Sequence, residues 1–293
     1  MLDIHIFDVD HGFCAAIDRY NHHSILIDTG FNTRTGFSPW QHLLKRQCRT
    51  IDCLVVPAYS PDNLAGIQPL LDHCLEHGLN INLLVANPTV DAEQFPELKA
   101  ASLWAKNYLD VTTKMHPECQ KTSQHMKVDD VDLSFFWNAQ DTYQASHDLS
   151  LVTFVSYDDI EIVFPSNLTA AGWQALLQCE DFRTHLRRVN TFVASNHGHE
   201  SGYCPEVFNY CRPDVVLISN QGNERVSSAM LNQYKIHAKG ASDGVCDGQR
   251  PALEGHRKVL TTYDNGTITI SKCLDRVRHI TAKSLVHQVE AIA

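Results

Sequence analysis

The sequence predicts a mixed α/β fold in one large domain, and three observations support this prediction. The chain has 293 residues, of which 43% are hydrophobic and 20% are charged, and this length can bury a sizeable core. Short apolar runs such as Leu54-Val55-Val56 are typical of buried strands. The stretch from Leu64 to His77 instead has the apolar spacing of an amphipathic helix.

Composition and charge narrow the class of protein. The formal net charge is −10 and the pI is about 5.9. This charge argues against nonspecific electrostatic binding to nucleic acid. We expect no secretory signal and no membrane span, because the first residues enter a strand directly and no apolar run reaches about 18 residues. Ten cysteines occur without C-x-x-C pairs, which is typical of reduced, buried thiols, so we expect a cytoplasmic location.

The first part of the chain is expected to alternate between strands and helices. Its apolar patterns predict strands at 2–8, 14–17, 24–30, 54–56 and 81–86, and helices at 39–48, 64–77 and 91–108. Gly78 follows the second of these helices, where a glycine is a plausible C-cap.

The second part is expected to contain more strands and a tail. Its patterns predict strands at 111–116 and 131–137 around a polar connector at 117–130, a hairpin at 148–164, a helix at 170–179, a strand at 189–195, a helix at 205–211, a strand at 213–219, a loop at 237–256 and a closing hairpin at 257–270. We expect residues 272–293 to form a surface helix outside the main domain.

One stretch of the sequence carries the clearest motif. After the apolar run come Pro57-Ala58-Tyr59-Ser60-Pro61-Asp62-Asn63-Leu64-Ala65-Gly66. This frame resembles the signature of the metallo-β-lactamase fold, a hydrophobic strand followed by T-H-x-H-x-D-H-x-G-G. The strand ending in Ile27-Asp28-Thr29-Gly30, the stretch His197-Gly198-His199-Glu200-Ser201-Gly202 and the closing 261–270 segment resemble further motifs of that family in the same order.

The resemblance covers roughly residues 1–271, and its order of motifs is most similar to the hydrolase domain of the DNA-uptake protein ComEC and its soluble relatives. It implies a single domain over 1–271 with an αββα sandwich, two sheets face to face with helices outside. The family does not explain the helical tail expected at 272–293.

The resemblance also implies that the family's metal chemistry is largely lost. Ala58 and Ser60 stand where the first two histidines belong, Asn63 replaces the third, and Asn167 replaces the bridging aspartate. The further former metal-site positions are Asp62, which is kept, and His197. A two-zinc centre needs about three protein ligands per metal with a carboxylate between them. We therefore predict that the chain binds no metal cofactor.

An altered site with one zinc or manganese ion is the alternative. Its ligands would come from Asp62, His147, Asp148, His197 and His199, with Asp10 and His11 nearby. The competing interpretation is structural, with Asp62 capping the following helix and the histidines hydrogen-bonded to backbone.

The sequence leaves three functional hypotheses. In the first, a catalytically degenerate protein binds a small anionic ligand or a protein partner in the old cleft, whose pocket includes Asp10, His11 and Tyr59. The alternative is an active hydrolase of a phosphodiester or related ester with one metal ion. The third is a structural subunit whose cleft is filled by Tyr59 and Phe13.

Overall fold

The computed structural model describes residues 2–9, 12–64, 66–90, 123–139, 146–220, 225–241, 245–247, 257–272 and 278–283. Within these ranges, no helix combines the length and the apolar character that a membrane crossing needs. The expected helix at 91–108 and the expected strand at 111–116 lie outside the described residues.

The first sheet holds both ends of the described chain. Its strands follow the order β13-β16-β15-β1-β2-β3-β4-β5, and β6 also pairs with β4. They are β1 (Leu2–Ile6), β2 (Ala15–Arg19), β3 (His23–Ile27), β4 (Thr50–Val56), β5 (Asn80–Ile81), β6 (Leu84–Ala86), β13 (Val245–Asp247), β15 (Thr267–Lys272) and β16 (Arg278–Lys283). Pairing is antiparallel from β16 to β3 and parallel from β3 through β4 to β5 and β6.

The second sheet follows the order β14-β12-β11-β10-β9-β8-β7. Its strands are β7 (Ser123–Val128), β8 (Val131–Phe136), β9 (Val152–Tyr157), β10 (Ile160–Phe164), β11 (Thr191–Val193), β12 (Val215–Ile218) and β14 (Val259–Thr261). The hairpin predicted at 148–164 is present as β9 and β10, joined by a turn at Asp158 with φ 54°. From β10 to β14 the strands run parallel, so their carboxyl ends meet at one edge.

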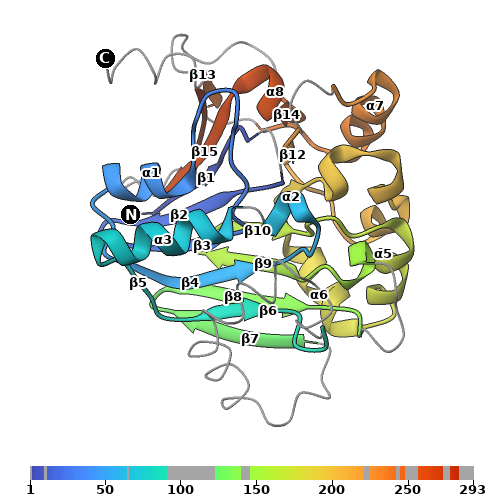
Figure 1. Ribbon diagram of the computed structural model, residues 1–293. Coiled ribbons are helices and arrows are strands. Elements are labelled where there is room, and N and C mark those ends of the chain that lie inside the picture. The colour runs from blue at the N-terminus through green and yellow to red at the C-terminus, as the bar shows by residue number, and fades with distance from the viewer. Residues whose placement is uncertain are drawn as a thin grey trace.

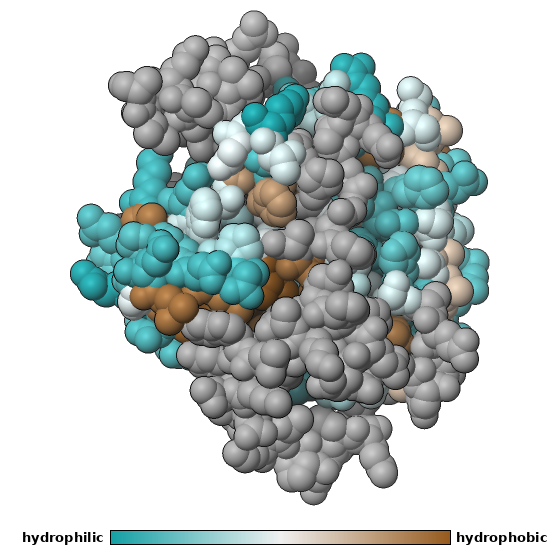
Figure 2. All heavy atoms as spheres, viewed as in Figure 1, coloured by the Kyte–Doolittle hydropathy of each residue, from teal (hydrophilic) through white to brown (hydrophobic). Residues whose placement is uncertain are grey.

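Helices cover the outer face of each sheet (Figure 1). On the first sheet lie α1 (Pro39–Lys45) and α3 (Ile67–His77), with the short α2 (Pro61–Leu64) before α3; on the second lie α5 (Ala170–Leu176), α6 (Glu180–Arg188) and α7 (Ser228–His237). Between β14 and β15 stands α8 (Thr262–Asn265), and short 3₁₀ turns are η2 (Ser146–Leu149), η3 (Ser195–Gly198), η4 (Glu200–Gly202) and η5 (Pro205–Asn209). In Figure 2 the face that carries α1 and α3 is largely hydrophilic, with apolar side chains gathered beside α3.

Three layers of apolar packing confirm the predicted αββα sandwich. The central core joins inward side chains of both sheets, such as Ile4 and Ile17 from the first and Val155 from the second. Two outer cores join each sheet to its helices, for example Leu43 of α1 on the first sheet and Trp173 of α5 on the second. Burying these apolar faces makes the largest favourable contribution to the free energy of folding, because each square ångström of apolar surface removed from water contributes about 25 cal/mol.

Four predicted elements differ in the structure. The stretch expected as a polar connector contains β7, which pairs with β8 along its whole length. The prediction of a closing hairpin is wrong, because β14 and β15 belong to different sheets and α8 lies between them in the chain. The tail expected as a helix instead contains β16, which extends the first sheet beside β15, and β13 within the expected loop pairs with β16.

A close backbone contact fixes the helix α3. Gly66 ends the turn before α3, and a Cβ added there would lie 1.7 Å from the carbonyl oxygen of Thr29, beyond the end of β3. Only glycine lets these two segments approach so closely. At the other end of α3, Gly78 has φ 66° and serves as the predicted left-handed C-cap.

We expect Gly66→Ala to destabilise the protein by about 3 kcal/mol or more, because Cβ would force the α3 entry away from the Thr29 backbone. Gly78→Ala is the matched control, since its Cβ would meet open space and only the left-handed backbone would be strained, by about 1 kcal/mol. Urea unfolding of both variants measures the difference. Equal losses of stability would contradict this account of Gly66.

Candidate functional site

The candidate site lies where β3, β4, β10 and β11 end. Directly after β3, Asp28 has φ 64°, a left-handed conformation that aspartate tolerates. Its backbone N–H donates to the carbonyl of Val55 in β4 at 2.8 Å. The Thr29 hydroxyl donates to the carbonyl of Asn63 at 3.2 Å, and this hydrogen bond connects the end of β3 to α2.

Four polar side chains from three separate segments form one hydrogen-bonded network at this edge. The Ser60 hydroxyl donates to Asn63 Oδ1 at 2.5 Å, and Asn167 Nδ2 donates to the same oxygen at 2.9 Å. Asn63 Nδ2 in turn donates to Asp28 Oδ2. Asn63 is 1% exposed and Asp28 2% exposed, so the network lies in the protein interior. It joins the first sheet, through Asp28 and Asn63, to the segment after β10 in the second sheet.

The Asp28 carboxyl is neutral at pH 7. Burial raises its pKa to about 8, and this effect outweighs the stabilisation of the carboxylate by the Thr29 N–H and the Asn63 amide. No cation appears among the causes of this shift. The network therefore consists of neutral groups.

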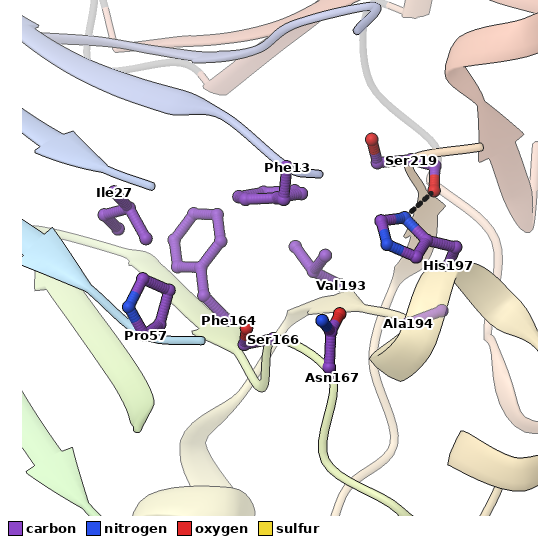
Figure 3. A pocket seen from close by; sticks show the side chains of 10 residues that line it. All are labelled: Phe13, Ile27, Pro57, Phe164, Ser166, Asn167, Val193, Ala194, His197 and Ser219. Atoms are coloured by element: carbon purple, nitrogen blue, oxygen red, sulfur yellow. Dashed lines mark hydrogen bonds between the residues drawn. The ribbon is translucent and has the colours of Figure 1, made fainter. Parts of the chain in front are cut away.

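A small apolar cavity of about 10 Å³, about the space of one water-sized sphere, lies beside the network. Figure 3 shows Phe13, Ile27, Pro57 and Phe164 gathered at one end, with the Phe13 and Phe164 rings 5.9 Å apart in a T-shaped arrangement. The other lining residues are Ser166, Asn167, Val193, Ala194, His197 and Ser219. Of the two aromatic residues that the third sequence hypothesis places in the cleft, Phe13 lines this cavity and Tyr59 does not.

An outer cleft of about 570 Å³ opens beyond His197. Its polar lining includes His147, His197, His199, Glu200 and Arg225, together with Thr169, Asn196, Ser201 and Ser227. His197 borders both spaces, and its Nδ1 lies 3.0 Å from the Ser219 carbonyl oxygen (Figure 3). A carbonyl only accepts, so Nδ1 carries the proton and Nε2 the lone pair in the neutral ring.

Several other predicted site residues have structural partners. Tyr59 is buried, and its hydroxyl accepts from the Asn87 N–H at 2.7 Å, while burial raises its pKa. The Asp148 carboxylate accepts from the Thr169 hydroxyl at the start of α5. His199 Nδ1 accepts from the Ser201 N–H at 3.2 Å, so this ring caps η4. Ala58 is buried and offers no side-chain donor or acceptor.

The remaining predicted residues are only partly described. Asp62 lies in α2, but its side chain falls outside the described residues, as do Asp10 and His11. Cys14 is completely buried, and burial with the neighbouring Asp28 raises its pKa well above the usual thiol value. A thiol held protonated in this way is a core residue.

Sequence reasoning missed two residues of this region. Asp28 ends a strand in the I-D-T-G segment, and this local pattern does not show that its carboxyl group meets Asn63. Arg225 belongs to none of the motifs named above, yet it lines the outer cleft and its guanidinium stacks 4.8 Å from the Tyr263 ring centroid.

Groups of three possible metal ligands occur outside the candidate site. In the described part of the chain they are His5–Asp18–His42, His73–Glu76–His77 and His125–Asp181–His185. None includes a residue of the outer cleft or of the network.

Comparison with known proteins identifies the fold. No family model matches the sequence, and no curated protein matches it. The structure is similar to the metallo-beta-lactamase fold protein YhfI from Bacillus subtilis, with a TM-score of 0.51 and 10% identity, covering 89% of this chain and 96% of that one. A diphosphatase of the PhnP family aligns with a TM-score of 0.44 and 8% identity, over 89% of this chain and 95% of that one. The first likeness shows that this chain has the metallo-β-lactamase fold.

Asp28 makes stability depend on pH. Its folded pKa of about 8 exceeds the unfolded value, so the folded state holds one more proton between about pH 4 and 8 and stability falls as pH rises through that window. Compared with Asp28→Asn, the wild type should lose up to about 1.4 kcal/mol per pH unit from pH 5.5 to 8. Urea unfolding of both proteins at several pH values measures this difference. Parallel stability curves would show that Asp28 is ionised in the fold.

Proposed function

We propose that this protein carries a catalytically degenerate form of the family's two-metal site and acts by binding a small anionic ligand in the outer cleft. The observation that carries the first part is the network of Ser60, Asn63, Asn167 and Asp28. The resemblance assigns the first three positions to metal ligands. In this chain their side chains bond to one another instead.

The donor chemistry of the network does not fit a two-metal centre. Zinc and manganese favour imidazole, thiolate and carboxylate donors, and neutral amides and hydroxyls are poor substitutes. Asn63 Oδ1 already accepts two hydrogen bonds, and Asn63 Nδ2 is a donor with no affinity for a cation. Asp28 is protonated at pH 7. Two dications would therefore meet no anionic charge from these four side chains.

The outer cleft supports anion binding. Arg225 presents a planar guanidinium that is always charged and suits phosphate and carboxylate oxygens. His147 and His199 line the same space and offer further ring N–H donors. Glu200 is the opposing charge in the lining. In a chain with net charge −10, this local group of basic side chains favours a small anion over an extended polyanion.

The single-metal hydrolase remains the second candidate, because three histidines line one cleft. The Asp148 carboxylate, which would complete such a site, is instead bonded to Thr169. His199 is bonded to its own turn through Ser201. These contacts favour the binding role over the hydrolase.

Pyrophosphate is a suitable probe of the cleft. We expect the wild type to bind it in calorimetric titration, and Arg225→Gln to weaken it by roughly tenfold or more, since a charged hydrogen bond contributes about 1.5–3 kcal/mol. Arg212→Gln is the matched control, because it removes the same charge from an exposed position outside the cleft lining. Equal affinities in the two variants, or no binding at millimolar pyrophosphate, would contradict the ligand role and leave a protein partner as the binding role to test.

Restoring the ligands tests the degenerate site directly. We expect the combined variant Ala58→His, Ser60→His, Asn63→His and Asn167→Asp to gain about two zinc ions per chain relative to wild type, as a two-metal site requires. Elemental analysis after gel filtration measures the gain. In the wild type, His197→Gln should leave the metal content unchanged. Loss of a stoichiometric ion on this change, together with loss of bis(p-nitrophenyl) phosphate hydrolysis, would establish the hydrolase instead.

A further inference from the structure

We infer that His5, Asp18 and His42 form a binding site for one divalent transition-metal ion, on the outer face of the first sheet beneath α1. His5 Nε2 lies 3.3 Å from Asp18 Oδ2, and His42 Nε2 lies 2.6 Å from the same oxygen. All three ligand atoms lie within 4.8 Å of one another. This site is separate from the outer cleft and does not depend on the proposed function.

Strand register brings the group together. β1 and β2 are antiparallel, with His5 opposite Ala16 and Asp3 opposite Asp18. Residues two apart on a strand face the same side, so His5 and Asp18 are diagonal neighbours on one face. That face packs on α1 through Leu43, next to His42. The T-shaped contact between the His5 and His42 rings, with centroids 4.8 Å apart, encloses the Asp18 carboxylate.

The spacing of the donor atoms suits a metal ion. Ligands about 2.0–2.1 Å from a tetrahedral zinc ion lie roughly 3.3 Å from one another. The His5–Asp18 distance already has this value. The His42–Asp18 contact is a direct hydrogen bond of 2.6 Å, so the His42 ring must withdraw by roughly 0.7 Å to admit an ion. Both histidine side chains are about 15% exposed, which leaves an approach for the ion and for a bound water.

Hydrogen bonds orient two of the proposed ligands, His5 and Asp18. His5 Nδ1 lies 2.9 Å from the Thr269 hydroxyl oxygen in β15, and the Ser24 hydroxyl donates to Asp18 Oδ1 at 2.6 Å. Such outer contacts fix the orientation of metal ligands in known sites. His5 Nε2 itself is buried and makes no hydrogen bond to any described residue. It lies 3.3 Å from Asp18 Oδ2, so a cation placed between them would be liganded by both groups.

Arg46 is the competing cation. Its Nε lies 3.5 Å from Asp18 Oδ2, and its guanidinium stacks 5.1 Å from the Tyr20 ring centroid. The Arg46 side chain is one-third exposed, so it can turn to solvent when an ion binds. Asp18 is therefore an anion surrounded by groups that either carry positive charge or ligate a metal.

Burial sets this group apart from the two other histidine groups. The Asp18 side chain is 1% exposed, whereas Glu76 and Asp181 in the other groups are 73% and 47% exposed. Exposed acids beside histidines are common without an ion, and their carboxylates are solvated by water. Two imidazoles and one carboxylate with an open position suit Zn²⁺ and related first-row ions. A bound ion would link α1 to β1 and β2 and so stabilise the fold.

Zinc titration of chelator-treated protein tests the site. We expect the wild type to bind one Zn²⁺ that survives gel filtration, with a rise in Tm of roughly 5 °C at 100-fold excess over Kd. His5→Gln and His42→Gln should each lose the ion and the rise in Tm. His73→Gln and His125→Gln are the matched controls, because they disrupt the two exposed groups, and they should keep both.

Thr269→Val provides a graded test that does not remove a ligand. It deletes the hydroxyl behind His5 while keeping a similar shape, and it should weaken Zn²⁺ about 10-fold or more with unchanged stoichiometry. This variant also keeps the proposal falsifiable if a histidine variant fails to fold. No stoichiometric zinc in the wild type, or zinc retained by both His5→Gln and His42→Gln, would overturn the site. Neither result bears on pyrophosphate binding in the outer cleft.

Discussion

The hydrogen bonds of Asn63 are the interaction on which the candidate site depends. This one amide accepts from Ser60 and Asn167 and donates to Asp28, so it connects α2, the end of β3 and the segment after β10. In the low dielectric of the interior, such a network stabilises the fold only while every member is satisfied. The close approach of Gly66 to Thr29 places α2 where the amide can reach all three partners.

The network also shapes the two spaces beside it. Asn167 belongs both to the network and to the lining of the apolar cavity, and His197 separates that cavity from the outer cleft. The backbone around His197 is strained, because the non-glycine residues Asn196 and His197 have left-handed φ values of 46° and 56°. Strained residues of this kind persist where the surrounding structure fixes them, and they are frequent at ligand sites. The rigid position of His197 therefore favours a binding role for the cleft.

The sequence predicted what local patterns control. The strand before the signature, the 148–164 hairpin and α3 with its Gly78 cap all follow from apolar spacing and turn residues. It could not predict pairings between distant segments. β14 and β15 adjoin in the chain but belong to opposite sheets, and the Asp28–Asn63 bond joins residues 35 positions apart. Asp18 and His5 become neighbours only through strand register, and His42 reaches them only after α1 packs on the sheet.

The two buried aspartates of the first sheet show how environment decides what a carboxyl group can do. Asp28 faces an amide and a backbone N–H, with no cation to offset its burial, so it is protonated at pH 7 and contributes a neutral group to the old site. Asp18 faces two imidazoles and Arg46, partners that favour the charged form. Only an anionic carboxylate can neutralise part of a dication. The surroundings of Asp18 therefore suit the divalent ion that we propose there, whereas burial of Asp28 among uncharged partners disfavours an ionised carboxylate at the end of β3.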